Sequence, residues 1–369
     1  MQNKSIHIIS FDNPFPPDYG GVIDVFYKIK TFHDLGYTIY LHCFYEHRNQ
    51  VSDALKAITQ TVYLYKKNRN LFFFLSVIPF GIKSRFHEDL VKNIEKINAP
   101  VFFEGLQTTM LMQKVVLQNK KYLRLHNLES NFYEGMSSSE SNWFKKFMYY
   151  FESKKYNTYQ KILNQFDHVF ALSHFEYNTV KTFTNKVTYV PVFHGNYKVT
   201  TLSGFGNYAF YHGDLRLPDN KKAAQFLMDV FKEIPEYKLI VASSNGKEWV
   251  ENQIKSFPNI EFICIENDTH LDTLLAKAHI NVMLSFQQSG TKLKVINSLF
   301  KSRFCLINYN MIDDERILQL CEIATSKEEF ISKIEELKNK PFLDAENREE
   351  VLLNVLDDTK NAKIILELF

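Results

Sequence analysis

The residues best suited to chemistry lie at 287–298, where a strongly apolar run is followed by Gln-Gln-Ser-Gly-Thr-Lys-Leu-Lys-Val-Ile-Asn-Ser. We expect a helix to open in this segment, with backbone amides at Gly290 and Thr291 and the positive end of the helix dipole free to meet an anion. Lys292 and Lys294 add two cations. Amides and cations in this arrangement are typical of a site for a diphosphate. The alternative is a surface helix with two exposed lysines.

Lys294 and Asn297 share one face of this helix, because they are three residues apart. The cation would therefore lie beside an amide that can bond a ribose hydroxyl. Four apolar residues on the other side are expected to hold the helix against a sheet; these are Leu293, Val295, Ile296 and Leu299.

His126 is the histidine for which the sequence favours a functional role. It ends an expected strand at 122–126, and a histidine at such a strand end reaches the loops that line a binding site. Glu104 ends the preceding expected strand, so we expect its carboxylate near His126. No cluster of carboxylates has the spacing of a metal site, and we predict no bound metal.

A glycine pair at Gly20 and Gly21 follows the first expected strand and a proline-rich loop. Glycine lets the backbone amides of the next helix approach a ligand closely. An ordinary turn between strand and helix is the alternative.

Short apolar runs alternate with helical periodicity along the whole chain, which is typical of parallel α/β architecture. The expected strands of the first half are 6–11, 38–44, 61–65, 101–104, 122–126, 168–172 and 188–192. Those of the second half are 208–212, 238–242, 260–265, 280–285 and 304–308. Each set predicts one Rossmann-like, doubly wound parallel-sheet domain, and the two domains are expected to face a central cleft.

Turn-forming residues at 194–207 predict the linker between a domain over 1–195 and a second domain over 208–345. A helix beginning near Pro218 is predicted by the apolar stripe Ala223, Phe226, Leu227, Val230 and Phe231. The tail over 346–369 is expected to be helical and to pack across the domains.

The composition excludes several classes of protein. The 369 residues are 45% hydrophobic and 23% charged, which favours globular domains over a disordered chain. The basic excess, 44 residues against 42 acidic ones, is concentrated before residue 190 and is too dilute for a nucleic-acid partner. Four widely separated cysteines indicate a reducing compartment. With no secretion signal or spanning segment in the sequence, we expect a cytoplasmic protein.

These segments resemble retaining glycosyltransferases with the GT-B fold, of the family 4 type, over nearly the whole chain, and are similar in particular to enzymes of Bacteroidetes-type bacteria. The matching segments are P-x-x-G-G at 17–21, H-N-x-E at 126–129, the turn at 211–215 and the helix start at 289–294. The resemblance assigns donor binding to Gly21, Arg216, Ser289, Gly290, Thr291, Lys292 and Asn297. It assigns catalysis to His126 and Lys294, and acceptor binding to Gly20, Glu104, Asn127 and Glu129.

The resemblance implies transfer of a sugar from a UDP- or GDP-linked donor to a hydroxyl of a glycan or lipid-linked glycan, with retention and without metal or cofactor. The departing phosphate would take the acceptor proton. Three positions depart from the family pattern: Ser289 and Asn297 replace glutamates, and Asp214 replaces an arginine. The alternative is therefore a non-catalytic glycan-binding or scaffolding subunit; an epimerase is disfavoured, because no second acid/base cluster is evident.

Aromatic and basic residues are mixed at 143–151, followed by Lys154 and Lys155, and Lys66, Lys67 and Arg69 precede an apolar run at 71–78. Either segment could contact the inner face of the cell membrane peripherally. Because the pattern distributes the aromatic residues all round the helix rather than on one face, we expect them to be buried.

Overall fold

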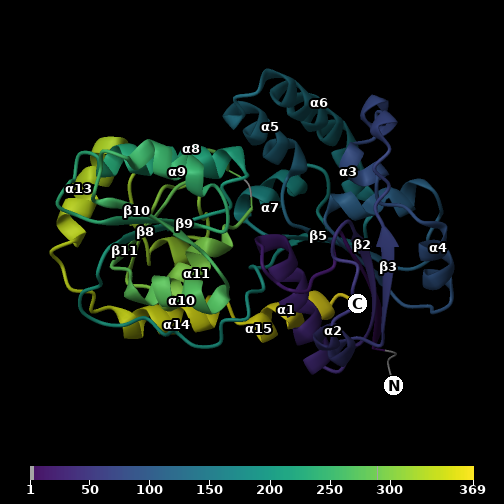
Figure 1. The fold of residues 1–369 in the computed structure, drawn as a ribbon. Coiled ribbons are helices and arrows are strands. Elements are labelled where there is room, and N and C mark those ends of the chain that lie inside the picture. Colours follow the sequence, from purple (N-terminus) through teal and green to yellow (C-terminus); the bar gives the residue numbers. More distant parts are fainter. Residues whose placement is uncertain (1–3, 289) are drawn as a thin grey trace. The chain divides into compact units, whose positions relative to one another are not determined.

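The computed structural model describes residues 4–288 and 290–369, drawn in Figure 1. The chain forms two compact units. The first comprises Met1–Glu134, Phe147–Gly195 and Asp358–Phe369, and the second comprises Gly135–Lys146 and Asn196–Asp357.

The first unit contains a seven-stranded parallel sheet in the order β3-β2-β1-β4-β5-β6-β7. Its strands are β1 (Ser5–Ser10), β2 (Thr38–Tyr45), β3 (Thr61–Lys66), β4 (Val101–Glu104), β5 (Lys121–Leu125), β6 (His168–Ala171) and β7 (Val187–Tyr189). All residues of the central strands β1 and β4 are buried, as expected for a sheet that is covered on both faces.

The second unit contains a six-stranded parallel sheet in the order β10-β9-β8-β11-β12-β13. Its strands are β8 (Ala209–His212), β9 (Leu239–Ser243), β10 (Ile260–Cys264), β11 (Ile280–Met283), β12 (Phe304–Ile307) and β13 (Glu322–Ile323). Figure 1 shows α8 and α9 over one face of this sheet and α10 and α11 over the other.

The helices connect these strands in chain order. Up to residue 195 they are α1 (Gly20–Asp34), α2 (Asp53–Ile58), η1 (Leu71–Leu75), α3 (Phe80–Lys83), α4 (Glu88–Glu95), η2 (Leu106–Gln113), α5 (Glu129–Ser139), α6 (Trp143–Tyr159), η3 (Gln160–Gln165) and α7 (His174–Lys181). Beyond it they are α8 (Pro218–Phe231), α9 (Lys247–Ile254), α10 (Asp268–Lys277), α11 (Leu293–Lys301), α12 (Glu315–Leu318), α13 (Lys327–Leu337), α14 (Ala345–Val355) and α15 (Asp358–Leu366).

The predicted α/β class is confirmed, with two parallel sheets in which every expected strand overlaps an observed one. The helix expected from the apolar stripe at 223–231 is α8, and most of that stripe is buried. Only β13 was not predicted, because it is two residues long and half-buried.

The expectation that the aromatic residues at 143–151 are buried is wrong. Trp143, Phe144, Phe147, Tyr150 and Phe151 are exposed. The face of α6 that packs inward carries Glu152, Ser153 and Tyr156 instead. Among the described residues, no helix has both the length and the apolar character needed to cross a membrane.

The tail of the chain is helical, but its two helices belong to different units: α14 lies in the second unit and α15 in the first. Asp358 begins α15, is buried, and accepts hydrogen bonds from the backbone amides of His194 (3.3 Å) and Gly195 (3.0 Å). The ring of Phe369 packs against that of Tyr122, with 4.4 Å between their centroids. The end of the chain is thus part of the first unit's core.

We predict that Asp358→Ala lowers the free energy of unfolding by about 1.5–3 kcal/mol, because two amides lose a charged acceptor. Urea-induced unfolding measures the change. Glu350→Ala, at an exposed position of α14, is the control and should leave the stability unchanged. Equal stability of both variants would show that Asp358 does not hold α15 in place.

Candidate functional site

The predicted site residues of the first unit gather at the carboxyl edge of its sheet. Gly20 begins α1 after the loop that follows β1, Glu104 is the last residue of β4, and His126 directly follows β5. Because the strands are parallel and β4 pairs with β5, the ends of both strands meet at this edge.

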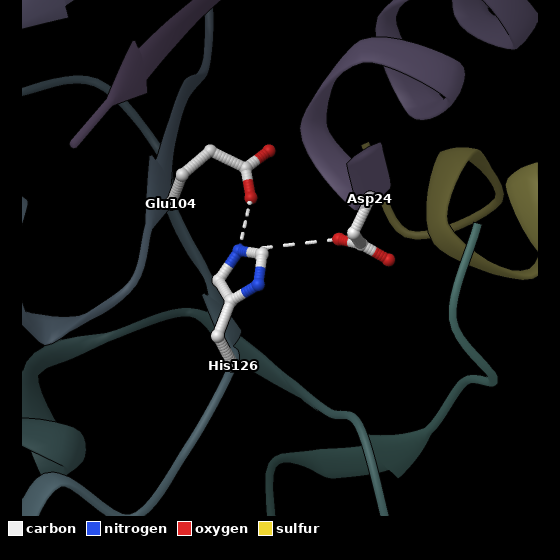
Figure 2. Close-up of side chains that lie close together, drawn as sticks. All are labelled: Asp24, Glu104 and His126. Carbon is white, nitrogen blue, oxygen red and sulfur yellow. Dashed lines mark hydrogen bonds and ion pairs between the residues drawn. The ribbon is translucent and has the colours of Figure 1, made fainter. Parts of the chain in front are cut away.

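A cluster of five buried charged or titratable side chains fills this edge: Asp24, Lys28, Glu104, Arg124 and His126. The Lys28 ammonium lies 2.8 Å from the Asp24 carboxylate and 2.9 Å from that of Glu104. His126 Nε2 lies 2.9 Å from Glu104 and 3.9 Å from Asp24. Figure 2 shows the imidazole between the two carboxylates. The prediction that the Glu104 carboxylate lies near His126 is therefore confirmed. The sequence did not predict that Asp24, Lys28 and Arg124 belong to the same cluster.

Asp24 is the most heavily contacted member of this cluster. Arg124 donates to its carboxylate through Nε (3.3 Å) and through a second nitrogen (3.0 Å), and the amide of Phe193 donates at 2.9 Å. Burial alone would raise the pKa of Asp24, but the charges of Arg124 and Lys28 outweigh it and hold that pKa far below its usual value. Asp24 is therefore a permanent anion.

His126 presents its ring to aromatic and polar neighbours. The Phe11 ring meets it edge-on, with 5.3 Å between the ring centroids. A side chain at Gly21 would collide with Phe11, since a Cβ there would lie 2.7 Å from the ring. Any other residue at Gly21 would therefore have to displace the Phe11 ring, which provides a structural reason for this glycine beside its predicted contact with the donor.

Glu104 has one engaged and one unengaged oxygen. Oε2 contacts Lys28 and His126, whereas Oε1 is buried and has no hydrogen-bond partner among the described residues. A buried acceptor without a partner is costly, and a ligand hydroxyl is the kind of donor that would satisfy it.

The carboxylates of Asp24 and Glu104 and the imidazole of His126 are also metal-ligand types, and their atoms lie within 4.8 Å of one another. Spacing along the sequence did not reveal this convergence. However, the Lys28 ammonium already contacts both carboxylates. A divalent cation at this point would meet a resident positive charge, so the cluster suits an internally balanced charge network better than a metal centre.

Glu129 lies in a second polar group at the start of α5, and Asn127 is half-buried before it. Gln107 donates to the Glu129 carboxylate at 2.5 Å. Burial raises the pKa of Glu129 to about 7, against the opposing charge of Arg85. Gln107 Oε1 and the Tyr156 hydroxyl are buried without hydrogen-bond partners among the described residues. These groups form a polar site able to accept or donate hydrogen bonds.

In the second unit, α11 begins at Leu293, later than the opening expected from the sequence. Ser289 lies outside the described residues. Gly290 has a φ of 65°, a left-handed conformation that keeps it in the loop, and Lys292 is extended as the residue before the helix. The expected apolar face of α11 is confirmed, with Leu293, Val295, Ile296 and Leu299 buried.

Gly290 and Thr291, whose amides were expected to be free, each have an interaction within the chain. The Lys292 amide donates to the carbonyl of Met311 at 3.4 Å. The positive end of α11 therefore consists of the amides of its first turn, at Leu293 and Lys294, which have no acceptor within the helix.

Lys294 is half-buried in this first turn. Its ammonium lies 3.3 Å from Oδ1 of Asn220 and 5.1 Å from the centre of the Tyr211 ring. No carboxylate of the described residues lies within ion-pair distance of it. Burial and the charge of Lys292 lower the pKa of Lys294 to about 8. The charge of Asp219 opposes this shift, but its carboxylate is not within ion-pair distance of Lys294. A desolvated cation without an ion-paired carboxylate favours an anionic ligand.

The remaining predicted donor residues of this unit are engaged by neighbours. Arg216 makes a forked contact with the carboxylate of Asp214, at 2.8–3.1 Å. Asn297 accepts a hydrogen bond from Asn196 at 3.0 Å.

No protein-family model matches the chain. A protein of Klebsiella pneumoniae described as "Uncharacterized 44.6 kDa protein in cps region" is 23% identical over 319 residues, which are 81% of each protein.

Solved structures resemble the chain over nearly its full length. TarM matches with a TM-score of 0.71 and 11% identity, covering 99% of this chain and 98% of that one. Sucrose-phosphate synthase from Thermosynechococcus elongatus matches with a TM-score of 0.67 and 12% identity, with the same coverage. Anabaena Alr3699/HepE, in complex with UDP and glucose, matches with a TM-score of 0.64 and 12% identity, covering 98% of both chains. These likenesses and the two parallel sheets show that the chain has the GT-B fold.

Proposed function

We propose that the chain is a retaining glycosyltransferase of the family 4 type, which transfers a sugar from a nucleoside diphosphate to a hydroxyl of a glycan or lipid-linked glycan without a metal. The observation that carries this proposal is Lys294, a half-buried cation without a carboxylate partner among the described residues, in the first turn of α11. A diphosphate would provide the Lys294 ammonium with an anionic partner and with further oxygen atoms that accept hydrogen bonds.

The ligands of the structural neighbours agree with a nucleotide-linked donor. Anabaena Alr3699/HepE was solved with UDP-glucose, and a mutant of S. aureus TarM was solved with fondaparinux, alpha-GlcNAc-glycerol and UDP. We extend this ligand class, a UDP- or GDP-linked sugar, to the present chain.

In the proposed donor site, Lys294 and Lys292 contact the diphosphate together with the segment at 289–291. Arg216 joins them by leaving Asp214, and Asn297 accepts a ribose hydroxyl in place of Asn196. Gly21 is the first-unit residue that we assign to the donor.

In the proposed reaction, the bond from the anomeric carbon to the diphosphate oxygen breaks and a bond from that carbon to the acceptor oxygen forms on the same face. The acceptor proton passes to the departing phosphate, whose negative charge the lysines and the first turn of α11 stabilise. His126, oriented by Glu104, bonds a hydroxyl of the transferred sugar. No protein base is needed.

We assign the acceptor to the first unit, where Gly20, Glu104, Asn127 and Glu129 lie. The unengaged oxygen of Glu104 and the polar group around Glu129 support this assignment. We propose a role in polysaccharide biosynthesis in the cytoplasm.

Lys294→Ala should weaken binding of UDP or GDP by about 10- to 100-fold, since a charge-assisted hydrogen bond contributes about 1.5–3 kcal/mol. Isothermal titration calorimetry with UDP, GDP and ADP measures this. Lys255→Ala, at an exposed lysine at the C-terminal end of α9, is the control and should bind normally. Glycan binding without hydrolysis or transfer of any UDP- or GDP-sugar would instead favour the non-catalytic subunit.

Diphosphate binding should depend on pH around the pKa of Lys294, which is about 8. Lys294 is charged below this pH and neutral above it, so affinity should fall as the pH rises from about 7 to about 9, and binding near pH 8 should take up protons. Calorimetry in two buffers of different ionisation enthalpy measures the uptake. Lys294→Arg stays charged and should bind without this dependence. An identical pH profile for both proteins would exclude Lys294 as the phosphate ligand.

Glu129→Gln should change both stability and acceptor use. A pKa raised to about 7 means that the folded protein keeps a proton that the unfolded chain has released, so stability falls as the pH rises from about 4.5 to about 7. The variant should therefore be more stable than the original by about 3 kcal/mol above pH 7 and equal to it near pH 4. Urea unfolding at several pH values tests this.

Glu134→Gln, on an exposed position of the same helix, is the matched control and should follow the original pH profile. If Glu129 also binds the acceptor, its variant raises the KM for acceptor without changing UDP affinity. An unchanged KM would show that Glu129 does not bind the acceptor, and it would not contradict the assignment of the donor site.

A further inference from the structure

An exposed apolar surface of the first unit has no role in the proposed reaction. It is formed by Leu71, Phe72, Leu75 and Val77, in and after η1, and by Phe147, Tyr150 and Phe151 on α6; we call it the η1–α6 surface. Phe72, Leu75 and Val77 are 76%, 82% and 87% exposed. Exposed apolar side chains gathered in this way, rather than scattered singly, mark an interaction site.

Two hydrogen bonds hold the parts of this surface together. The Lys155 ammonium of α6 donates to the carbonyl of Phe74 at 2.8 Å, and the amide of Phe80 donates to the Glu152 carboxylate at 2.8 Å. The rings of Phe74 and Phe80 stack with their centroids 4.3 Å apart. Figure 1 accordingly shows α3 beside the end of α6. The segment that carries the exposed side chains of η1 is therefore attached to α6 by these hydrogen bonds.

The exposed residues of α6 follow helical spacing. Phe147, Tyr150, Phe151 and Lys154 lie on one face, while Glu152 and Ser153 are buried on the other. The rings of Phe147 and Phe151 are in contact, with 4.4 Å between centroids. An apolar stripe on the outer face of a surface helix is the reverse of ordinary packing, in which that face is polar.

Basic residues border the apolar ones. The Lys154 ammonium lies 5.0 Å from the centre of the Tyr150 ring, and the Lys83 ammonium lies 5.1 Å from that of Phe73. Lys66 is exposed at the end of β3. The nearby carboxylate of Glu152 is buried and paired with Lys155, at 2.6 Å. The charge presented outward with the aromatic side chains is therefore positive.

Aromatic and aliphatic side chains bordered by lysines match the interface of an anionic bilayer, where rings enter the headgroup region and ammonium groups meet phosphates. Interfaces between proteins contain less lysine than the rest of the protein surface, so the lysines favour lipid over self-association.

We infer that the η1–α6 surface docks the chain peripherally on an anionic lipid bilayer, with Leu71, Phe72 and Leu75 entering the lipid and Lys83 and Lys154 at the headgroups. The inference is independent of the proposed transfer reaction. If both hold, a lipid-linked glycan is the acceptor that the docked chain would meet.

Co-sedimentation with vesicles tests the inference, using phosphatidylcholine alone and phosphatidylcholine with about one-third phosphatidylglycerol. The chain should bind the anionic vesicles, bind the neutral ones far more weakly, and dissociate as salt is raised. The double variant Phe72→Ser/Leu75→Ser should reduce vesicle partitioning at least about tenfold, because two exposed apolar side chains are lost.

Val116→Ser is the matched control, because Val116 is 88% exposed but lies before β5, at the opposite edge of the sheet. It should bind vesicles like the original chain. Circular dichroism and UDP titration report whether the double variant keeps its fold and donor site. Failure of the original chain to bind anionic vesicles would overturn the inference, as would binding that the double variant retains. Dimerisation in the absence of lipid, abolished by the double variant, would show that a second copy covers the surface instead.

Discussion

The first unit depends on the neutralisation of one buried carboxylate. Asp24 is permanently charged and 1% exposed, and an anion in such a place is stable only when cations and amides surround it. Lys28, Arg124 and the Phe193 amide supply this environment from a helix, a strand and a loop far apart in the sequence. Because Lys28 also contacts Glu104, which contacts His126, the same charge balance positions the candidate site.

Most of the fold could be predicted because its strands are continuous buried apolar runs, which carry a clear signal in the sequence. The start of α11 could not be predicted from the sequence, because it depends on the left-handed turn at Gly290 and on the extended conformation of Lys292. The aromatic residues of α6 were misjudged for a different reason. They were expected to surround the helix, whereas Phe147, Tyr150 and Phe151 share one exposed face of it.

The candidate site was only partly predictable. His126 and Glu104 were found because each ends a strand, and strand ends are visible in the sequence. Asp24 and Lys28 look like an ordinary helical pair, four residues apart, of the kind found on solvent-facing surfaces. Only tertiary packing, which buries both beside Arg124, reveals their importance. The lowered pKa of Lys294 likewise results from surroundings that sequence spacing does not report.

The division of the first unit among three stretches of chain has a consequence for how the protein folds. Phe369 and α15 complete a core that also contains Phe32, Phe102 and Tyr122, yet they emerge from the ribosome only after the whole second unit. The first unit therefore cannot reach its final packing until the second unit has been synthesised, although nearly all of its strands and helices are already present. Until α15 has been synthesised, the apolar surface that it covers stays exposed to water, and a chaperone would matter most in this interval.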